Sequence, residues 1–255
     1  MKGTTVPTKK FNIIWTVIAI AFMLAVWGVA YLITNNDYVI PSIEQTAVHF
    51  AMLFISPTFW LYSLYTILRA LASLLISFFL ASLFTCLSAI SPAFKRISVV
   101  IISFFRTLPT MAITLMLLLW SNPFVAPIIV TILVLFPLTY LQFMTAYDGI
   151  DKNLIQMATV YSFTRKQKLK NIYLPIMLKS VLAQVGANVS FGLKIVVSAE
   201  IMCYTFESLG GAIYHAQLFV RVPQFMALVL FVVVFGAILE WVFSLLNKIS
   251  ERWSK

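Results

Sequence analysis

The chain has 255 residues, of which 62% are hydrophobic and 10% are charged, and its formal net charge is +10. This composition excludes a water-soluble domain, and a mean hydropathy of +0.98 is typical of a protein that crosses the membrane several times. The basic residues punctuate apolar runs instead of gathering on one soluble face, which argues against nucleic-acid binding.

The first apolar run, residues 11–33, predicts a retained transmembrane helix. It is longer than the hydrophobic stretch of a secretory signal, and no small-x-small cleavage site follows it. The run ends before Asn35. Ser42 and Gln45 then have capping-box spacing, which predicts a short helix along the outer surface of the membrane.

Three further spans are predicted before the longest polar passage, at residues 59–90, 97–120 and 124–147. Small residues recur every four positions in the first of these, a pattern that lets another helix approach closely. They are Ser73, Ser77, Ala81 and Thr85. Pro109 lies inside the next span, where its missing N–H and its ring predict a kink or a break.

Residues 148–175 form the longest polar passage and predict two short helices outside the membrane. Asp151 is the expected N-cap of the first helix, which carries one apolar stripe. The stripe consists of Leu154, Met157, Ala158 and Tyr161. Thr164 and Gln167 have capping-box spacing for the second helix, which Pro175 is expected to end. Such a loop can bind another protein, and an ordinary basic loop between two spans is the alternative.

The same passage contains Gln156-Met157-Ala158, then Ser162 after three residues, and Ile172-Tyr173-Leu174-Pro175 after nine more. It resembles the cytoplasmic-loop signature of binding-protein-dependent ABC importer permeases, Glu-Ala-Ala, three residues, Gly, nine residues and Ile-x-Leu-Pro. The spacing is the same, while two letters of the head and the glycine differ. A left-handed turn at Ser162 would cost about 1 kcal/mol or more. The resemblance implies that the loop couples to an ATPase through Leu154, Gln156, Met157, Ala158, Tyr161, Ser162, Ile172, Leu174 and Pro175.

A fifth span at residues 176–204 is unusually polar, and a sixth follows at 224–246. Lys or Arg at the bilayer centre costs about 2.5 to 3.5 kcal/mol, so charges within spans indicate a water-filled pathway or a protein interior. The pathway candidates are Arg69, Arg106, Gln184, Asn188, Lys194 and Glu200. Snorkelling or structural pairing, for instance of Lys194 with Glu200, is the alternative. Glu200 falls near the outer end of its span, which favours an interfacial or gating position.

The distribution of Lys and Arg predicts the orientation. Fourteen of the 18 fall on one side of the six spans, Arg221 falls on the other, and three lie within spans. Both termini and the loop at 148–175 are therefore expected in the cytoplasm, in a single all-α transmembrane domain of residues 1–255. The sequence contains no phosphate-binding loop, useful metal-ligand pair or catalytic constellation, so we expect a transport subunit without metal, cofactor or enzyme activity of its own.

Motifs outside the loop resemble the nitrate/sulfonate/taurine branch of these permeases. They are Ile40-Pro41-Ser42, Arg69, Arg106-Thr107-Leu108-Pro109, Ala199-Glu200 and Leu209-Gly210. Family glycines are replaced by Ser77, Ala81, Thr85 and Ser208. The resemblance implies a type I ABC importer permease in the cytoplasmic (inner) membrane, where two permeases pair. Two ATPase subunits that use ATP receive the loops, and an extracytoplasmic binding protein delivers a small solute.

An ATP-independent secondary transporter or channel is the main alternative, because it too would use polar residues on a fifth helix. It would not need an amphipathic cytoplasmic loop, and the inverted repeat common in such transporters is not visible. Whether the two permeases are identical stays open, and so does the solute. Taurine, alkanesulfonates, nitrate, pyrimidine vitamin precursors and riboflavin-like compounds fit the branch, and Arg69, Arg106 and Lys194 favour an anion.

Overall fold

The computed structural model describes residues 13–253, and every regular element among them is a helix. In chain order they are α1 (Ile13–Thr34), α2 (Ile43–Leu53), α3 (Pro57–Ile90), α4 (Pro92–Thr107), α5 (Thr110–Trp120), α6 (Ala126–Asp148), α7 (Lys152–Val160), α8 (Arg165–Lys168), the π-helical turn η1 (Leu169–Tyr173), α9 (Leu174–Met202), α10 (Leu209–Leu218) and α11 (Val222–Trp253). The first two residues of the expected span 11–33 and the predicted cytoplasmic residues Lys2, Lys9, Lys10 and Lys255 lie outside the described residues.

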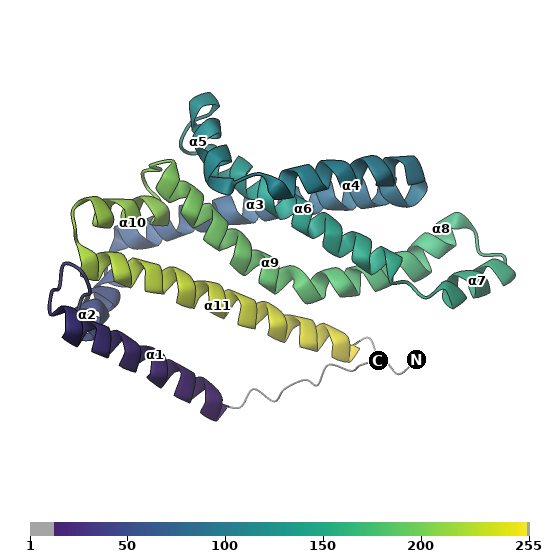
Figure 1. The fold of residues 1–255 in the computed structure, drawn as a ribbon. Coiled ribbons are helices and arrows are strands. Elements are labelled where there is room, and N and C mark those ends of the chain that lie inside the picture. The colour runs from purple at the N-terminus through teal and green to yellow at the C-terminus, as the bar shows by residue number, and fades with distance from the viewer. Residues whose placement is uncertain (1–12, 254–255) are drawn as a thin grey trace.

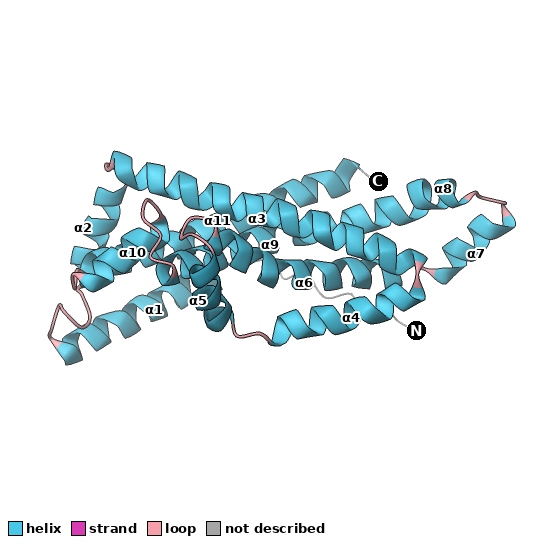
Figure 2. Cartoon of the chain, turned by 90° about the horizontal axis from the view of Figure 1, so that it is seen from above, coloured by secondary structure: helices cyan, strands magenta, loops and turns pink. Residues whose placement is uncertain are grey.

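The long helices run roughly side by side in an elongated bundle (Figures 1 and 2). α3 packs along α6, and α9 packs against both α6 and α11. The short helices α2 and α10 lie at one end of the bundle, and α7 and α8 project from the other (Figure 1). The end of α11 points toward the side that carries α7 and α8 (Figure 1). The end with α2 and α10 and the end with α7 and α8 are therefore separated by the length of the bundle.

The contact between α3 and α6 is lined by small side chains. Ser73, Ser77, Ala81 and Thr85 are all buried, as their four-residue spacing predicts. The Ser73 hydroxyl lies 2.8 Å from the Arg69 carbonyl oxygen and 3.3 Å from the Ile128 carbonyl oxygen on α6. The predicted close approach of a second helix is confirmed.

Five described helices are long and apolar enough to cross a membrane, or six segments if α4 and α5 count as one bent span. The axes of α4 and α5 meet at 92°. Pro109 is the N-cap of α5 and has an extended backbone conformation, which confirms the predicted break at this proline. Residues 97–120 therefore form two helices at a sharp angle and not one straight helix. The most apolar stretch of α1 buries none of its residues, and the Trp27 indole N–H donates to the Pro41 carbonyl oxygen at 3.1 Å.

The expectation that Pro175 ends the second loop helix is wrong. One apolar helix of 37 residues continues from Lys166 to Met202. Proline lacks an N–H and its ring clashes with the carbonyl four residues earlier. The π-helical turn η1 relieves this clash by widening the helix, and the Leu174 N–H bonds to the Leu169 carbonyl, five residues back. The helix of the fifth span therefore starts inside the loop and not at residue 176.

Candidate functional site

The loop between α6 and α9 is folded through local caps. The Asp151 carboxylate accepts a hydrogen bond from the Asn153 N–H at 2.8 Å, which confirms the predicted N-cap of α7. At the other end of α7, Ser162 has a φ of 54°. The Phe163 N–H donates to the Ala158 carbonyl at 2.8 Å, and the Ser162 N–H donates to the Thr159 carbonyl at 3.0 Å. These two bonds form a Schellman cap, so the turn keeps the left-handed shape that glycine would favour.

The second loop helix begins with the predicted capping box. The Thr164 N–H donates to the Gln167 side-chain oxygen at 2.8 Å, and the Gln167 N–H donates to the Thr164 hydroxyl at 3.3 Å. The Lys168 ammonium donates to the Thr159 hydroxyl at 2.8 Å and so joins the two loop helices. The loop is thus a defined unit built from hydrogen bonds that span nine residues or fewer.

A small apolar core fixes this unit to the bundle. Ile150, Ala158 and Ile172 are buried together, and partly buried side chains surround them. The rings of Tyr147 and Tyr173 stack with centroids 5.4 Å apart, which joins the end of α6 to η1. Ala158 is 0% exposed, so it packs the loop internally and does not share the outward surface of the predicted stripe.

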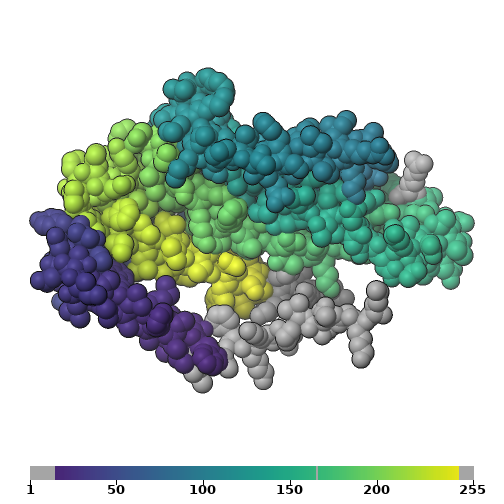
Figure 3. Space-filling view, in the orientation of Figure 1, coloured from purple at the N-terminus to yellow at the C-terminus, as the bar shows by residue number. Residues whose placement is uncertain are grey.

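The other members of the stripe face outward. Leu154, Met157 and Tyr161 are exposed, and Val160, which the sequence analysis did not include, is 81% exposed beside them. In the space-filling view the loop forms a lobe at one end of the molecule (Figure 3). Gln156, Leu174 and Pro175 are also exposed, while Ile172 is buried. Val160 follows Met157 by three residues, the spacing at which helical neighbours share a surface.

At the opposite end of the bundle, Glu200 on α9 joins three helices. Its carboxylate accepts from the Arg69 guanidinium of α3 at 2.8 Å, from the Thr66 hydroxyl of α3 at 2.9 Å and from the Gly210 N–H of α10 at 3.1 Å. The Thr66 hydroxyl also accepts from the Leu209 N–H at 3.0 Å. Glu200 is 0% exposed. The proposed pairing of Lys194 with Glu200 is therefore wrong, because Arg69 holds that position.

Two polar candidates of the fifth span have structural partners. Asn188 is buried and exchanges two hydrogen bonds with Gln142 of α6, at 2.7 and 3.0 Å. The Gln184 side-chain amide donates to the Ser180 carbonyl of its own helix at 3.4 Å. Each amide of the Asn188–Gln142 pair donates one hydrogen bond and accepts one, so the pair ties α9 to α6.

The remaining candidates lie on an open surface. Phe191, Lys194 and Ser198 are exposed and follow one another at helical spacing along α9. Arg106, at the end of α4, is also exposed. Arg106 and Phe191 line a hollow of about 210 Å³ beside the α4–α5 break, with Pro137 of α6 on its wall. A lysine on such a surface is costly in lipid, which favours water or another protein beside this side of α9, whereas the Ser198 hydroxyl donates to the Lys194 carbonyl of its own helix at 2.9 Å.

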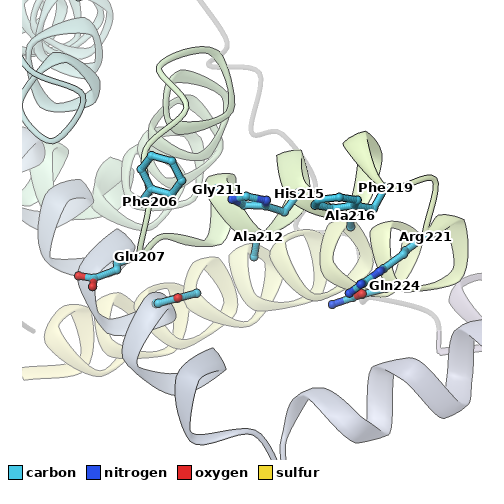
Figure 4. A pocket seen from close by; sticks show the side chains of 10 residues that line it. Phe206, Glu207, Gly211, Ala212, His215, Ala216, Phe219, Arg221 and Gln224 are labelled. Atoms are coloured by element: carbon cyan, nitrogen blue, oxygen red, sulfur yellow. The ribbon is translucent and has the colours of Figure 1, made fainter.

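A larger hollow of about 510 Å³ opens at the α10 end. Figure 4 shows Phe206, His215 and Phe219 along one side of it, with Glu207 and Arg221 at opposite ends. The Arg221 guanidinium lies 5.6 Å from the Phe219 ring centroid. The hollow thus combines an aromatic wall with one acidic and one basic end.

Residues 73–253 match the family of binding-protein-dependent transport system inner membrane components. The chain belongs to this family. It is therefore the permease component of an ABC importer and a protein of the inner membrane, and the family implies an ATPase and a binding protein as partners. The matched residues include the whole loop and the Glu200 cluster except Thr66 and Arg69. No curated protein matches the sequence.

Two crystal structures of ABC transporters have a similar fold. One is an amino acid ABC transporter with histidines, with a TM-score of 0.65 and 15% identity over 79% of this chain and 96% of that chain. The other is a bacterial ABC transporter involved in the import of the acidic polysaccharide alginate. It has a TM-score of 0.66 and 17% identity over 92% of this chain and 95% of that chain. At these identities the likeness supports the fold.

Proposed function

We propose that this permease belongs to the nitrate/sulfonate/taurine branch and works as one of two membrane subunits of an ATP-driven importer. In this proposal six spans place both termini and the loop of α7, α8 and η1 in the cytoplasm. The loop docks on a separate ATPase, and the chain has no ATPase site of its own. The motifs at residues 40–42, 106–109, 199–200 and 209–210 support the branch. The distribution of Lys and Arg supports the orientation.

The exposed apolar surface of α7 carries this proposal. Leu154, Met157, Val160 and Tyr161 form an apolar cluster on a lobe that the caps and the Ala158 core hold away from the bundle. A contiguous apolar surface held in water by a rigid support is typical of a protein-binding site. Lys166 and Lys170 are exposed on the adjoining helix and complement an acidic rim on the partner.

The geometry supports a lever mechanism. ATP binding closes the two ATPase subunits, and each docked loop moves with its ATPase as a rigid unit. The helix from Lys166 to Met202 carries this motion into the membrane. Two permeases then turn their open α9 surfaces, with Lys194 and Ser198, toward a shared pathway that opens outward. Arg106 lies beside this surface, and the positive charges favour an anionic solute. Hydrolysis resets the pathway toward the cytoplasm.

The extracytoplasmic binding protein docks, in this proposal, on the end formed by α2 and α10. The hollow of Figure 4 is part of that surface. Glu207 and Arg221 are separated by the length of α10, which is roughly 15 Å for ten residues at about 1.5 Å each. This separation exceeds what one small solute spans and suits two contact points on a protein.

A pull-down from detergent-solubilised membranes tests the coupling. The double variant Met157→Asp with Tyr161→Asp adds two carboxylates to the apolar surface without touching the buried core of the loop. Thr159→Asp is the matched control, because Thr159 is exposed on another side of α7 and its hydroxyl already accepts from Lys168. We expect an ATPase subunit to co-purify with the wild type and the control, and to be lost from the double variant.

Retention of the ATPase by the folded double variant would contradict docking through α7. If the wild-type chain carries no ATPase under conditions that preserve membrane complexes, the importer mechanism fails. The chain alone would then be tested for transport in liposomes, as the secondary-transporter alternative requires.

A further inference from the structure

The Glu200 cluster joins three helices through one buried carboxylate. Glu200 lies two residues before the end of α9, Thr66 and Arg69 lie on α3, and Leu209 and Gly210 begin α10. Each carboxylate oxygen has at least one donor within 3.1 Å. The first N–H groups of a helix lack partners within that helix, and the buried Glu200 carboxylate accepts from one of them, the Gly210 N–H, while Thr66 and Ser208 accept from its neighbours.

The cluster is enclosed by protein within this chain. Glu200 is fully enclosed, and the Arg69 side chain is 11% exposed. The Arg69 guanidinium also lies 5.8 Å from the Phe124 ring centroid, beside the turn before α6. A carboxylate in this setting has no solute-accessible face, so its contribution is mechanical.

The start of α10 has little freedom to slide over Glu200. A methyl group at Gly210 would collide with the Glu200 side chain and would lie 2.7 Å from the Val197 carbonyl oxygen. The Ser208 hydroxyl accepts from the Gly211 N–H at 2.8 Å and donates to the Thr205 carbonyl at 2.8 Å. The backbone of α10 therefore contacts α9 directly, with the Glu200 bonds closing the contact.

The same helix that ends at this contact begins in the loop. Lys166 and Glu200 are separated by 34 residues of one helix, roughly 50 Å at about 1.5 Å per residue. We propose that Glu200 is a positioning residue that makes α10 follow α9, so that movement of the loop changes the outer hollow. This inference rests on the proposed coupling of the loop to an ATPase.

Movement of α10 would change the hollow at the outer end of the bundle. Gly211 and His215 of α10, and Phe219 directly after it, line the hollow of Figure 4. If α10 moves with α9, the shape of this hollow reports the nucleotide state of the distant ATPase. The binding protein then meets different surfaces before and after ATP binding, without any contact of its own to the ATPase.

Hydrogen exchange of the purified permease–ATPase complex tests the proposal without knowledge of the solute. ATP with vanadate traps the closed ATPase, and exchange is followed in residues 152–174 of the loop and 205–218 around α10. In the wild type we expect both segments to respond. In Glu200→Gln we expect the loop to respond as before and the response around α10 to fall roughly tenfold, within the range of known coupling effects.

Asp148→Asn is the matched control. Asp148 forms the other ion pair among residues 13–253, with Lys95 at 2.8 Å, but both side chains are substantially exposed, at 52% and 39%. Surface pairs of this kind contribute little, so both segments should respond in the control as in the wild type.

Three results would overturn the proposal. The first is an α10 response in Glu200→Gln equal to that of the wild type, and the second is a parallel loss of response in the loop and in α10. The third is a wild-type loop that does not respond, which refutes the proposed coupling itself and the inference with it. If Glu200→Gln does not assemble, Thr66→Val removes only the hydroxyl that joins Glu200 to the Leu209 N–H. An unchanged α10 response in Thr66→Val would equally overturn the proposal.

Discussion

Ser162 occupies a backbone conformation that L-residues rarely adopt. Its φ of 54° lies in the left-handed region, where a residue with a Cβ atom is less stable than glycine by about 1 to 2 kcal/mol. The cap bonds from Ser162 and Phe163 and the Ala158 core hold this turn in place. The family signature has glycine at this position. This chain keeps the left-handed turn with a serine, at the expense of some backbone strain.

Ser162→Gly should therefore stabilise the loop by about 1 kcal/mol. The expected result is slower hydrogen exchange at the Ser162 and Phe163 amides, which the cap protects. Ser121→Gly is the control, because Ser121 has a φ of −133°, where glycine brings no relief. Faster exchange at these amides in Ser162→Gly would refute the account of strain.

Local residue patterns predicted local geometry correctly. The caps at Ser42, Asp151 and Thr164 depend on neighbours two or three residues away, and all three form. The partner of Glu200 could not be found in the same way, because Arg69 is 131 residues distant in the chain. The role of Thr66 could have been predicted from one pattern in the sequence. It precedes Arg69 by three residues and therefore lies on the same side of the helix.

At the scale of elements, α3 approaches α6 through small residues whose hydroxyls are not equally satisfied. The Ser73 hydroxyl has carbonyl partners on α3 and α6. The buried hydroxyls of Ser77 and Thr85 have no hydrogen-bond partner among residues 13–253. A buried donor without a partner costs about 1 to 3 kcal/mol, so the two serines should respond differently to the loss of their hydroxyl groups.

Ser77→Ala should leave the thermal unfolding midpoint unchanged or raise it, because the substitution removes an unsatisfied hydroxyl and keeps the helix spacing. Ser73→Ala should lower the midpoint by the loss of one hydrogen bond, which the hydroxyl donates mainly to the Arg69 carbonyl at 2.8 Å with the Ile128 carbonyl at 3.3 Å, at a cost of about 0.5 to 1.5 kcal/mol. The measurement is unfolding of the purified protein in one detergent. A larger loss of stability in Ser77→Ala than in Ser73→Ala would contradict this assignment.

The periodicity of apolar and small residues predicted the helices, but it did not predict where each helix ends. A proline after a polar stretch usually stops a helix, so the sequence predicts that Pro175 separates the loop from the fifth span. The π-helical turn from Leu169 to Tyr173 lets the helix continue. Nothing in the spacing of those five residues indicates a π-helical turn. The continuous helix that runs from the loop to Glu200 is for this reason visible only in the structure.

At the scale of the whole molecule, two surfaces of the single chain are incomplete. α1 buries none of its most apolar stretch, and the open surface of α9 presents Lys194 and Ser198 within a helix apolar enough to cross a membrane. The sequence identified Lys194 as a costly charge, yet it could not tell lipid, water and protein surroundings apart. That distinction depends on what packs against this surface, which in the proposed importer is a second permease subunit that the sequence of one chain does not contain.

The open surface of α9 predicts that a cysteine at position 198 meets water. In a Cys86→Ser background, which removes the exposed native thiol, Ser198→Cys should react with a charged, water-soluble thiol reagent roughly tenfold faster than Leu75→Cys. The reactive thiolate forms in water and is disfavoured in hydrocarbon. Leu75 is the control because it is 67% exposed on α3 but lies in an apolar stretch suited to lipid. Equally slow reaction at both positions in native membranes would mean that α9 faces lipid or a dry interface, and the pathway would have to lie elsewhere.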